Sequence, residues 1–162
     1  MNNVLITGIT GFVGSHLADF LVNKKNIKLF GLRRYHLSKE ENIIHLTNKI
    51  EWFDCDLLDS KAIQQVIKKI KPDIIFHMAA QSFVSPSWSH PSLYMNANYQ
   101  MTVNLFEACL VNNVNPLIHL PGSGEEYGEI AQNELPINEN TILRPVNPYA
   151  VTKIAQDFIA YV

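Results

Sequence analysis

The sequence is poor in cysteine and carries no excess of either charge. Only Cys55 and Cys109 are present, both among apolar residues. A disulfide framework is therefore excluded, and we expect two reduced thiols in or near the core. The formal net charge is -2, which provides no basic surface for nucleic acid or for a membrane. Neither nucleic acid nor a membrane is expected as a partner.

Long hydrophobic runs are also missing. No apolar stretch approaches the roughly 20 residues that span a bilayer. Met1-Asn2-Asn3 leads into an apolar segment without a basic flank or a cleavage site, which predicts a soluble, cytoplasmic protein. The six histidines lack metal-ligand spacing, so no metal is expected. His77, which ends an apolar run, is interpreted as a core histidine.

What is present is an alternation of short apolar runs with helical patterns. Hydrophobic residues make up 47% of the 162 residues, enough for one domain with a sizeable core. The expected strands are 4–6, 28–32, 50–54, 74–77 and 116–120, and the expected helices are 12–22, 59–71, 92–111 and one starting near 149. This alternation predicts an α/β fold, a doubly wound parallel sheet of Rossmann-like type.

Two of these segments carry more detailed expectations. Segment 38–48 is predicted to be a short helix or a turn, with Ser38 as its N-cap. In segment 12–22 the apolar residues recur at helical spacing and are expected to form the buried face; they are Phe12, Val13, Leu17, Phe20 and Leu21.

A glycine-rich turn follows the first expected strand. Thr7-Gly8-Ile9-Thr10-Gly11-Phe12-Val13-Gly14 has the pattern G-x-x-G-x-x-G and opens the first expected helix. Glycines here let the backbone turn tightly and approach a pyrophosphate, which the helix N-terminus binds through its N–H groups. The candidate cofactor-binding residues of this turn are Gly8, Thr10, Gly11, Phe12, Val13 and Gly14.

The end of the second strand indicates which dinucleotide to expect. A site for NAD usually carries an acid there for the ribose 2'-hydroxyl, whereas arginine suits a 2'-phosphate. Arg33 and Arg34 follow Gly31-Leu32 at this point, and two guanidiniums suit a phosphate dianion. NADP is therefore favoured over NAD, with a solvated basic surface as the alternative interpretation.

Two other strand ends supply candidate cofactor residues. Asp56, followed by Leu57, comes after the third strand and is a candidate acceptor for the adenine amino group. Ala79 and Ala80 follow the fourth strand, where small residues let the backbone run close to a ligand. Asp59 is expected to cap the next helix instead.

Tyr149 and Lys153 stand four residues apart near the end of the sequence. That step places both side chains on one face of a helix. A lysine ammonium beside a phenol favours the phenolate, which can act as a base near neutrality. The pair predicts proton transfer to or from a hydroxyl or carbonyl oxygen; a solvated helix face is the alternative.

Five segments carry a family resemblance: the glycine turn, Arg33-Arg34, Ala79-Ala80-Gln81-Ser82-Phe83-Val84 with Ser87-Trp88, Gly122-Ser123-Gly124-Glu125-Glu126-Tyr127-Gly128, and Pro148-Tyr149-Ala150-Val151-Thr152-Lys153. Together they resemble the extended short-chain dehydrogenase/reductase family. Within it they are similar to the GDP-mannose 4,6-dehydratases and the related GDP-4-keto-6-deoxymannose reductases. The run around Gln81 and Ser82 is the most specific to the GDP-mannose branch.

The resemblance implies roles for individual residues. Ser123 matches a residue that hydrogen-bonds the sugar's 4-oxygen, and Tyr149 matches the base for the 4-hydroxyl. Lys153 matches the residue that favours the phenolate and holds the nicotinamide ribose. Glu125 matches the glutamate that takes the C5 proton. Gln81 and Ser82 fall in the substrate-binding segment, and Glu126 is expected to be solvated.

The family resemblance also sets the scope of the chain. It implies that residues 1–162 are the NAD(P)-binding domain of a longer enzyme, that the substrate-binding domain lies outside this sequence, and that turnover by this chain alone is weak or absent. The substrate class is a nucleotide sugar, GDP-mannose in the first place, and the expected assembly is a homodimer or a higher homo-oligomer.

Three functions stay open. An NADP-dependent nucleotide-sugar 4,6-dehydratase is favoured by Glu125. A reductase or epimerase of the same superfamily is favoured by the Ser123-Gly124 pairing and by the loop length before Pro148. Met101, where the family has glycine, and Val146, where the dehydratases usually have arginine, are departures that count against the dehydratase. The third is a non-catalytic dinucleotide-binding module, or an assembly fragment that pairs through its long helices.

Overall fold

The computed structural model describes residues 1–34 and 37–162, and they form two compact units. The first, which we call the sheet unit, comprises Met1–Ala80 and Met101–Pro121; the second, the helical unit, comprises Gln81–Gln100 and Gly122–Val162. In the described part of the chain, no helix is long and apolar enough to cross a membrane.

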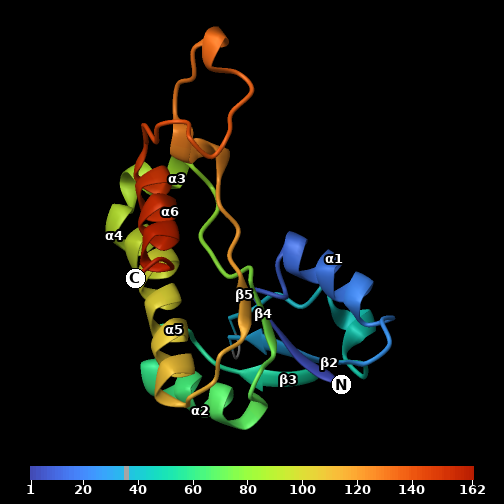
Figure 1. Ribbon diagram of the computed structural model, residues 1–162. Coiled ribbons are helices and arrows are strands. Elements are labelled where there is room, and N and C mark those ends of the chain that lie inside the picture. The colour runs from blue at the N-terminus through green and yellow to red at the C-terminus, as the bar shows by residue number, and fades with distance from the viewer. Residues whose placement is uncertain (35–36) are drawn as a thin grey trace. The chain divides into compact units, whose positions relative to one another are not determined.

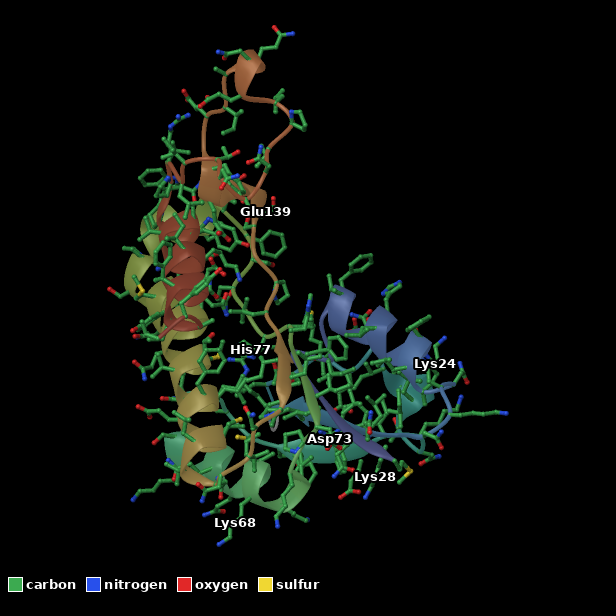
Figure 2. The ribbon with its side chains drawn as sticks, in the orientation of Figure 1. Lys24, Lys28, Lys68, Asp73, His77 and Glu139 are labelled. Carbon is green, nitrogen blue, oxygen red and sulfur yellow. The ribbon has the colours of Figure 1, made fainter. Side chains whose placement is uncertain are left out.

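The sheet unit is built on five parallel strands in the order β3-β2-β1-β4-β5 (Figure 1). Their bounds are β1 Asn2–Thr7, β2 Ile27–Arg33, β3 Glu51–Asp54, β4 Ile74–His77 and β5 Leu117–His119. The strand order reverses between β1 and β4, which is the switch point of a doubly wound sheet. Figure 2 shows Asp73 and His77 at opposite ends of β4. The predicted fold class is confirmed.

Helices cover both faces of this sheet. On one face Leu5 of β1 belongs to a cluster with α2 (Ser60–Ile70) and α5 (Met101–Val111). On the other face Val4 and Ile6 pack with α1 (Phe12–Leu21). Side chains alternate between the faces of a strand, so consecutive apolar residues of β1 serve two cores. This explains why Val4, Leu5 and Ile6 are consecutive apolar residues and do not alternate with polar ones.

Both cysteines lie in the core cluster beneath α2 and α5. Burial, aided by the nearby Asp59 and Asp56 carboxylates, raises the pKa of the Cys55 thiol to about 12. Burial alone raises the pKa of Cys109 to about 11. Both thiols are therefore neutral at physiological pH, as expected for inert core residues.

Two expectations for the sheet unit were correct only in part: Leu21 is buried on the first helix as predicted, and segment 38–48 does form turns and a short helix. The buried face of α1 consists of Gly14, Ser15, Ala18 and Leu21, whereas Phe12 and Phe20 are exposed. Small residues are needed there because the helix lies against the glycine turn. Segment 38–48 contains turns and one short 3₁₀ helix, η1 (Ile44–Leu46). Ser38 does not cap a helix; its Oγ accepts from the N–H of Arg34 at 2.9 Å.

The helical unit contains α3 (Ser85–Ser89), α4 (Pro91–Tyr94), the π-helix η2 (Met95–Gln100), the 3₁₀ helices η3 (Gly124–Tyr127) and η4 (Gln132–Glu134), and α6 (Pro148–Ile159). The long helix predicted for 92–111 is confirmed as a helical run over 91–111, with a π-helical turn between α4 and α5. Such turns widen the backbone locally and are frequent at functional sites. Apolar periodicity did not reveal this turn.

Candidate active site

The glycine turn joins β1 to α1, as predicted. Gly8 has φ +63°, and a Cβ on it would lie 2.6 Å from the backbone N of Ala79. A Cβ on Gly14 would lie 2.4 Å from the carbonyl oxygen of Gly8. Both positions therefore need glycine, the first for its conformation and both for close backbone approach. The segment after β4 runs directly against this turn, which places Ala79 beside Gly8.

The N-terminus of α1 suits an anion. Gly11 is its N-cap and brings no side-chain hydrogen bond to the first turn. The helix has ten residues, so its dipole and first N–H groups are oriented toward the glycine turn. A backbone cradle without side chains, at the start of a helix, fits the pyrophosphate of a dinucleotide.

The end of β2 differs from the simple expectation of two free arginines. Arg33 Nε donates to Asp54 at 3.0 Å, and its Nη1 donates to Glu40 at 2.6 Å. Arg34 is exposed and forms no ion pair with any residue in the ranges 1–34 and 37–162. Both arginines thus stand where the sequence placed them, but only one guanidinium is without a carboxylate partner.

The other predicted cofactor residues lie at the ends of β3 and β4. One oxygen of Asp56 accepts from the N–H of Leu58 at 2.9 Å, and the side chain of Leu57 is in the core. Asp59 caps α2 through Lys61 and Ala62, as expected.

His77 is a core histidine, as the sequence predicted. Its Nδ1 is 2.8 Å from Thr7 Oγ1, and its Nε2 is 3.1 Å from Thr102 Oγ1. Thr7 Oγ1 also accepts from the N–H of Ala79 at 3.2 Å. The imidazole therefore fixes the end of β1 against the segment that follows β4. Among the described residues, no group of three His, Cys, Asp or Glu side chains is arranged to hold a metal ion.

In the helical unit, Ser123 begins η3 and is fixed by a capping box. Its Oγ accepts from the N–H of Glu125 at 3.2 Å, and its own N–H donates to Glu126 at 2.7 Å. The expectation that Glu126 is solvated was wrong, because this reciprocal cap draws its carboxylate inside. Glu126 is therefore a structural residue of the turn that presents Ser123 and Glu125.

Glu125 is exposed on the same turn and is held by one contact from a distant part of the sequence. Asn147 Nδ2 donates to Glu125 Oε2 at 2.7 Å. Asn147 is also the N-cap of α6, where its Oδ1 accepts from the N–H of Ala150 at 2.8 Å. One amide thus ties the candidate C5 base to the start of the helix that carries Tyr149 and Lys153.

Tyr149 and Lys153 are both largely buried on α6. The Tyr149 ring meets the ring of Tyr94 edge-on, with centroids 6.4 Å apart. Lys153 Nζ donates to Oε1 of Gln156, one turn further along the helix. Burial lowers the pKa of Lys153, and the Glu126 and Asp157 carboxylates oppose that shift. The ammonium is thus enclosed among polar groups of its own unit.

The predicted substrate segment begins at Gln81. Its backbone N–H donates to Asn98 Oδ1 at 2.8 Å, and its carbonyl accepts from Asn98 Nδ2 at 3.1 Å. Asn98 belongs to the π-helical turn and also donates to Thr152 Oγ1 at 2.9 Å. Thr152 in turn donates to the carbonyl of Tyr149 at 2.7 Å. Ser82 is exposed beside Gln81.

Sequence reasoning missed Asn98, Asn147 and Gln156 as supports of these residues. Asn147 before Pro148 has the N-cap and N1 pattern of a helix start, so its cap was detectable. Its bond to Glu125 was not, because 22 positions separate the two. Asn98 acts through a π-helical turn that apolar periodicity does not reveal.

Replacing Glu126 with Gln should change how stability depends on pH. Burial raises the pKa of Glu126 above its ordinary 4.5, against the lowering effect of the Ser123 N–H. Its contribution to stability is therefore complete below the unfolded pKa and is lost as pH rises through the folded pKa. Glutamine keeps the acceptor for Ser123, so the variant should gain stability relative to the parent between pH 4 and pH 7.

Urea unfolding at several pH values measures that difference. Glu129→Gln removes an exposed carboxylate from the same connection and serves as the control. If the difference in free energy of unfolding between the parent and Glu126→Gln stayed constant from pH 4 to pH 7, burial would not be raising the pKa of Glu126.

The comparisons with known proteins agree with these features. A family model described as GDP-mannose 4,6 dehydratase matches residues 5–162. A curated GDP-mannose 4,6-dehydratase of Yersinia enterocolitica is 32% identical over 95% of this chain. The chain spans 43% of that protein's length, so it corresponds to less than half of this relative.

Solved structures give the same fold with two cofactors. UDP-glucose 4-epimerase of Thermus thermophilus in complex with NAD superposes with a TM-score of 0.86 at 30% identity, over 98% of this chain and 50% of that one. RMD of Pseudomonas aeruginosa complexed with NADPH gives 0.78 at 28% identity, over 98% and 48%. Because the family model covers nearly all of the sequence, the chain belongs to the GDP-mannose 4,6 dehydratase family, within the nucleotide-sugar dehydratases, epimerases and reductases.

Proposed function

We propose that the protein is an NADP-dependent nucleotide-sugar 4,6-dehydratase that converts GDP-mannose to GDP-4-keto-6-deoxymannose. The observation that carries the dehydratase reaction is the Asn147 bridge, which holds the Glu125 carboxylate at the start of the Tyr149 helix. Oxidation and reduction need only a hydroxyl base and its supports, whereas removal of water needs a further carboxylate. Residues 1–162 supply the cofactor-binding part, and the substrate-binding domain belongs to the remainder of the enzyme.

In this proposal the residues of the helical unit move the protons. Tyr149 removes the proton from the sugar's O4, with Lys153 favouring its phenolate and Ser123 holding the 4-oxygen. When bound, a nicotinamide dinucleotide would supply the hydride chemistry, oxidation at C4 and reduction at C6. The new 4-ketone acidifies C5–H, and Glu125 takes this proton. The C6 hydroxyl then leaves as water with one of the two protons that were taken up, and the other protonates C5 as C6 is reduced, so the overall change is the loss of one water molecule.

For the cofactor, the glycine turn, the uncapped start of α1 and the exposed Arg34 support a dinucleotide with a 2'-phosphate. Asp56 is proposed as the acceptor for the adenine amino group, and Gln81 and Ser82 as substrate contacts. A homodimer or higher homo-oligomer is part of the same proposal.

A reductase or epimerase is the second candidate, because Ser123-Gly124 and Val146 depart from the dehydratase pattern. Glu125→Gln separates the two. A dehydratase variant should still oxidise C4 but should release at least about 100-fold less 4-keto-6-deoxy product, since it lacks the C5 base. Mass spectrometry of the products that the whole enzyme containing residues 1–162, as parent and as variant, forms from GDP-mannose and NADP measures this loss. An unchanged product yield would sink the assignment of Glu125, and product from neither protein would sink the dehydratase.

A further inference from the structure

One arginine at the cofactor end of the sheet is already occupied. The Arg33 guanidinium uses Nε for Asp54 and Nη1 for Glu40. Its side chain is only 23% exposed, whereas those of Glu40 and Asp54 are 45% and 42% exposed. Two carboxylates therefore neutralise the guanidinium that the sequence assigns to a 2'-phosphate. Nothing in the proposed function explains why an NADP site would carry this arrangement.

Arg33 is also held in place by an aromatic ring of the neighbouring strand. Its guanidinium stands over the Trp52 ring at 5.4 Å from the centroid. Trp52 fits there because Gly31 has no Cβ; one would lie 2.7 Å from the indole. The Arg33 carbonyl accepts from the N–H of Cys55 at 2.8 Å. The guanidinium is thus fixed over an aromatic ring at the end of β2, and it is not a freely mobile arm.

The two carboxylates differ in how they are held. Asp54 is paired with Arg33 in the register of β2 and β3, so its position follows from the sheet. Glu40 comes from the connection after β2, which Asn42 anchors to the glycine turn through the carbonyl of Thr10 at 3.1 Å. Glu40 stands two residues before this anchor and outside any strand, so its carboxylate can leave Arg33 without disturbing the sheet.

We propose that Glu40 is a specificity-determining residue that competes with the 2'-phosphate of NADP for Arg33. When NADP binds, the phosphate must displace the Glu40 carboxylate, and the displaced carboxylate still repels the phosphate dianion. NAD has a 2'-hydroxyl in place of the phosphate, so its binding neither displaces Glu40 nor suffers this repulsion. Glu40 thus lowers the ratio of NADP to NAD affinity that Arg33 and Arg34 would otherwise produce. Discrimination between the two dinucleotides then rests mainly on Arg34. This inference rests on the proposed binding of a nicotinamide dinucleotide.

Two small energies set how far Glu40 changes the affinity for NADP: the cost of displacing its carboxylate and the repulsion that remains. An exposed ion pair contributes little to stability, so displacing Glu40 changes affinity only a few-fold. Repulsion between a carboxylate and a phosphate dianion in water is of similar size and is screened by salt. Together they predict that Glu40→Gln raises the ratio of NADPH to NADH affinity about tenfold, equal to about 1.4 kcal/mol.

Equilibrium dissociation constants for NADPH and NADH, measured by calorimetry for the parent and the variant, test this. Glu41→Gln is the matched control, because Glu41 is the adjacent exposed acid and its loss changes the net charge equally. We expect the affinity ratio to rise in Glu40→Gln and to stay within about twofold of the parent in Glu41→Gln. At about 0.5 M salt the difference should shrink.

Three results would contradict the proposal in different ways. An unchanged ratio in Glu40→Gln, with melting temperature equal to the parent, would show that Glu40 does not compete for Arg33. An equal rise in both variants would assign the effect to bulk charge. If the parent binds neither dinucleotide, the proposed cofactor fails first and the inference about Glu40 fails with it.

Discussion

Replacing Tyr149 with Phe should reduce turnover of the nucleotide sugar by about 10²- to 10⁴-fold, the usual contribution of a positioned acid–base group. The variant loses only the phenolic oxygen. The ring keeps its edge contact with Tyr94 and its place on α6, so the fold and the affinity for NADPH should not change. Turnover by the whole enzyme containing residues 1–162 under saturating cofactor, the affinity for NADPH and the melting temperature measure the two parts of this expectation.

Tyr161→Phe is the matched control for this substitution. Tyr161 lies just beyond the same helix and its side chain is 85% exposed, so loss of its hydroxyl should leave turnover unchanged. If Tyr149→Phe retained more than about a tenth of the parent's turnover, Tyr149 would not be the base. If both variants lost turnover equally, the effect would come from the helix and not from proton transfer.

Replacing Gly8 with Ala should strongly destabilise the sheet unit, because it combines backbone strain with a close contact. Alanine at φ +63° is strained, and its Cβ would lie 2.6 Å from the backbone of Ala79. Left-handed strain and forced overpacking together predict a loss of about 2–4 kcal/mol in the free energy of unfolding. Because the glycine turn must shift, affinity for the dinucleotide should fall as well. Urea unfolding and calorimetry measure the two losses.

Gly124→Ala provides the comparison. A Cβ on Gly124 would have no neighbour within 4 Å, and this glycine does not have a positive φ. Its replacement should change stability by less than about 1 kcal/mol, with a small gain expected from the less flexible unfolded chain. Equal losses in the two variants would mean that the close approach of Gly8 to Ala79 does not limit stability.

The fold could be predicted because the strands and the glycine turn are specified locally. Every strand of the sheet was found within a few residues of its apolar run, since β1 and its neighbours are covered on both faces. The buried face of α1 was predicted correctly only at Leu21, for a physical reason. Close packing on the glycine turn demands small residues, so the large ones, Phe12 and Phe20, are left outside.

The contacts that support the candidate site could not be predicted, because they join residues far apart in sequence. Glu125 is held from Asn147, and Asn98 joins Gln81 to Thr152. Arg33 and Arg34 look equivalent in the sequence. Only the structure distinguishes the arginine neutralised by Glu40 and Asp54 from the exposed one. Residue types thus indicate the chemistry, whereas pairing between elements decides which groups are available for it.

The path of the C4 hydrogen tests the proposed function most directly. The whole enzyme containing residues 1–162 is incubated with GDP-mannose carrying deuterium at C4 and with unlabelled NADP, and the product is examined by mass spectrometry and NMR. A 4,6-dehydratase is expected to yield a 4-keto-6-deoxy sugar with the deuterium at C6. Deuterium that stays at C4, whether the sugar is inverted or unchanged, would contradict the proposal.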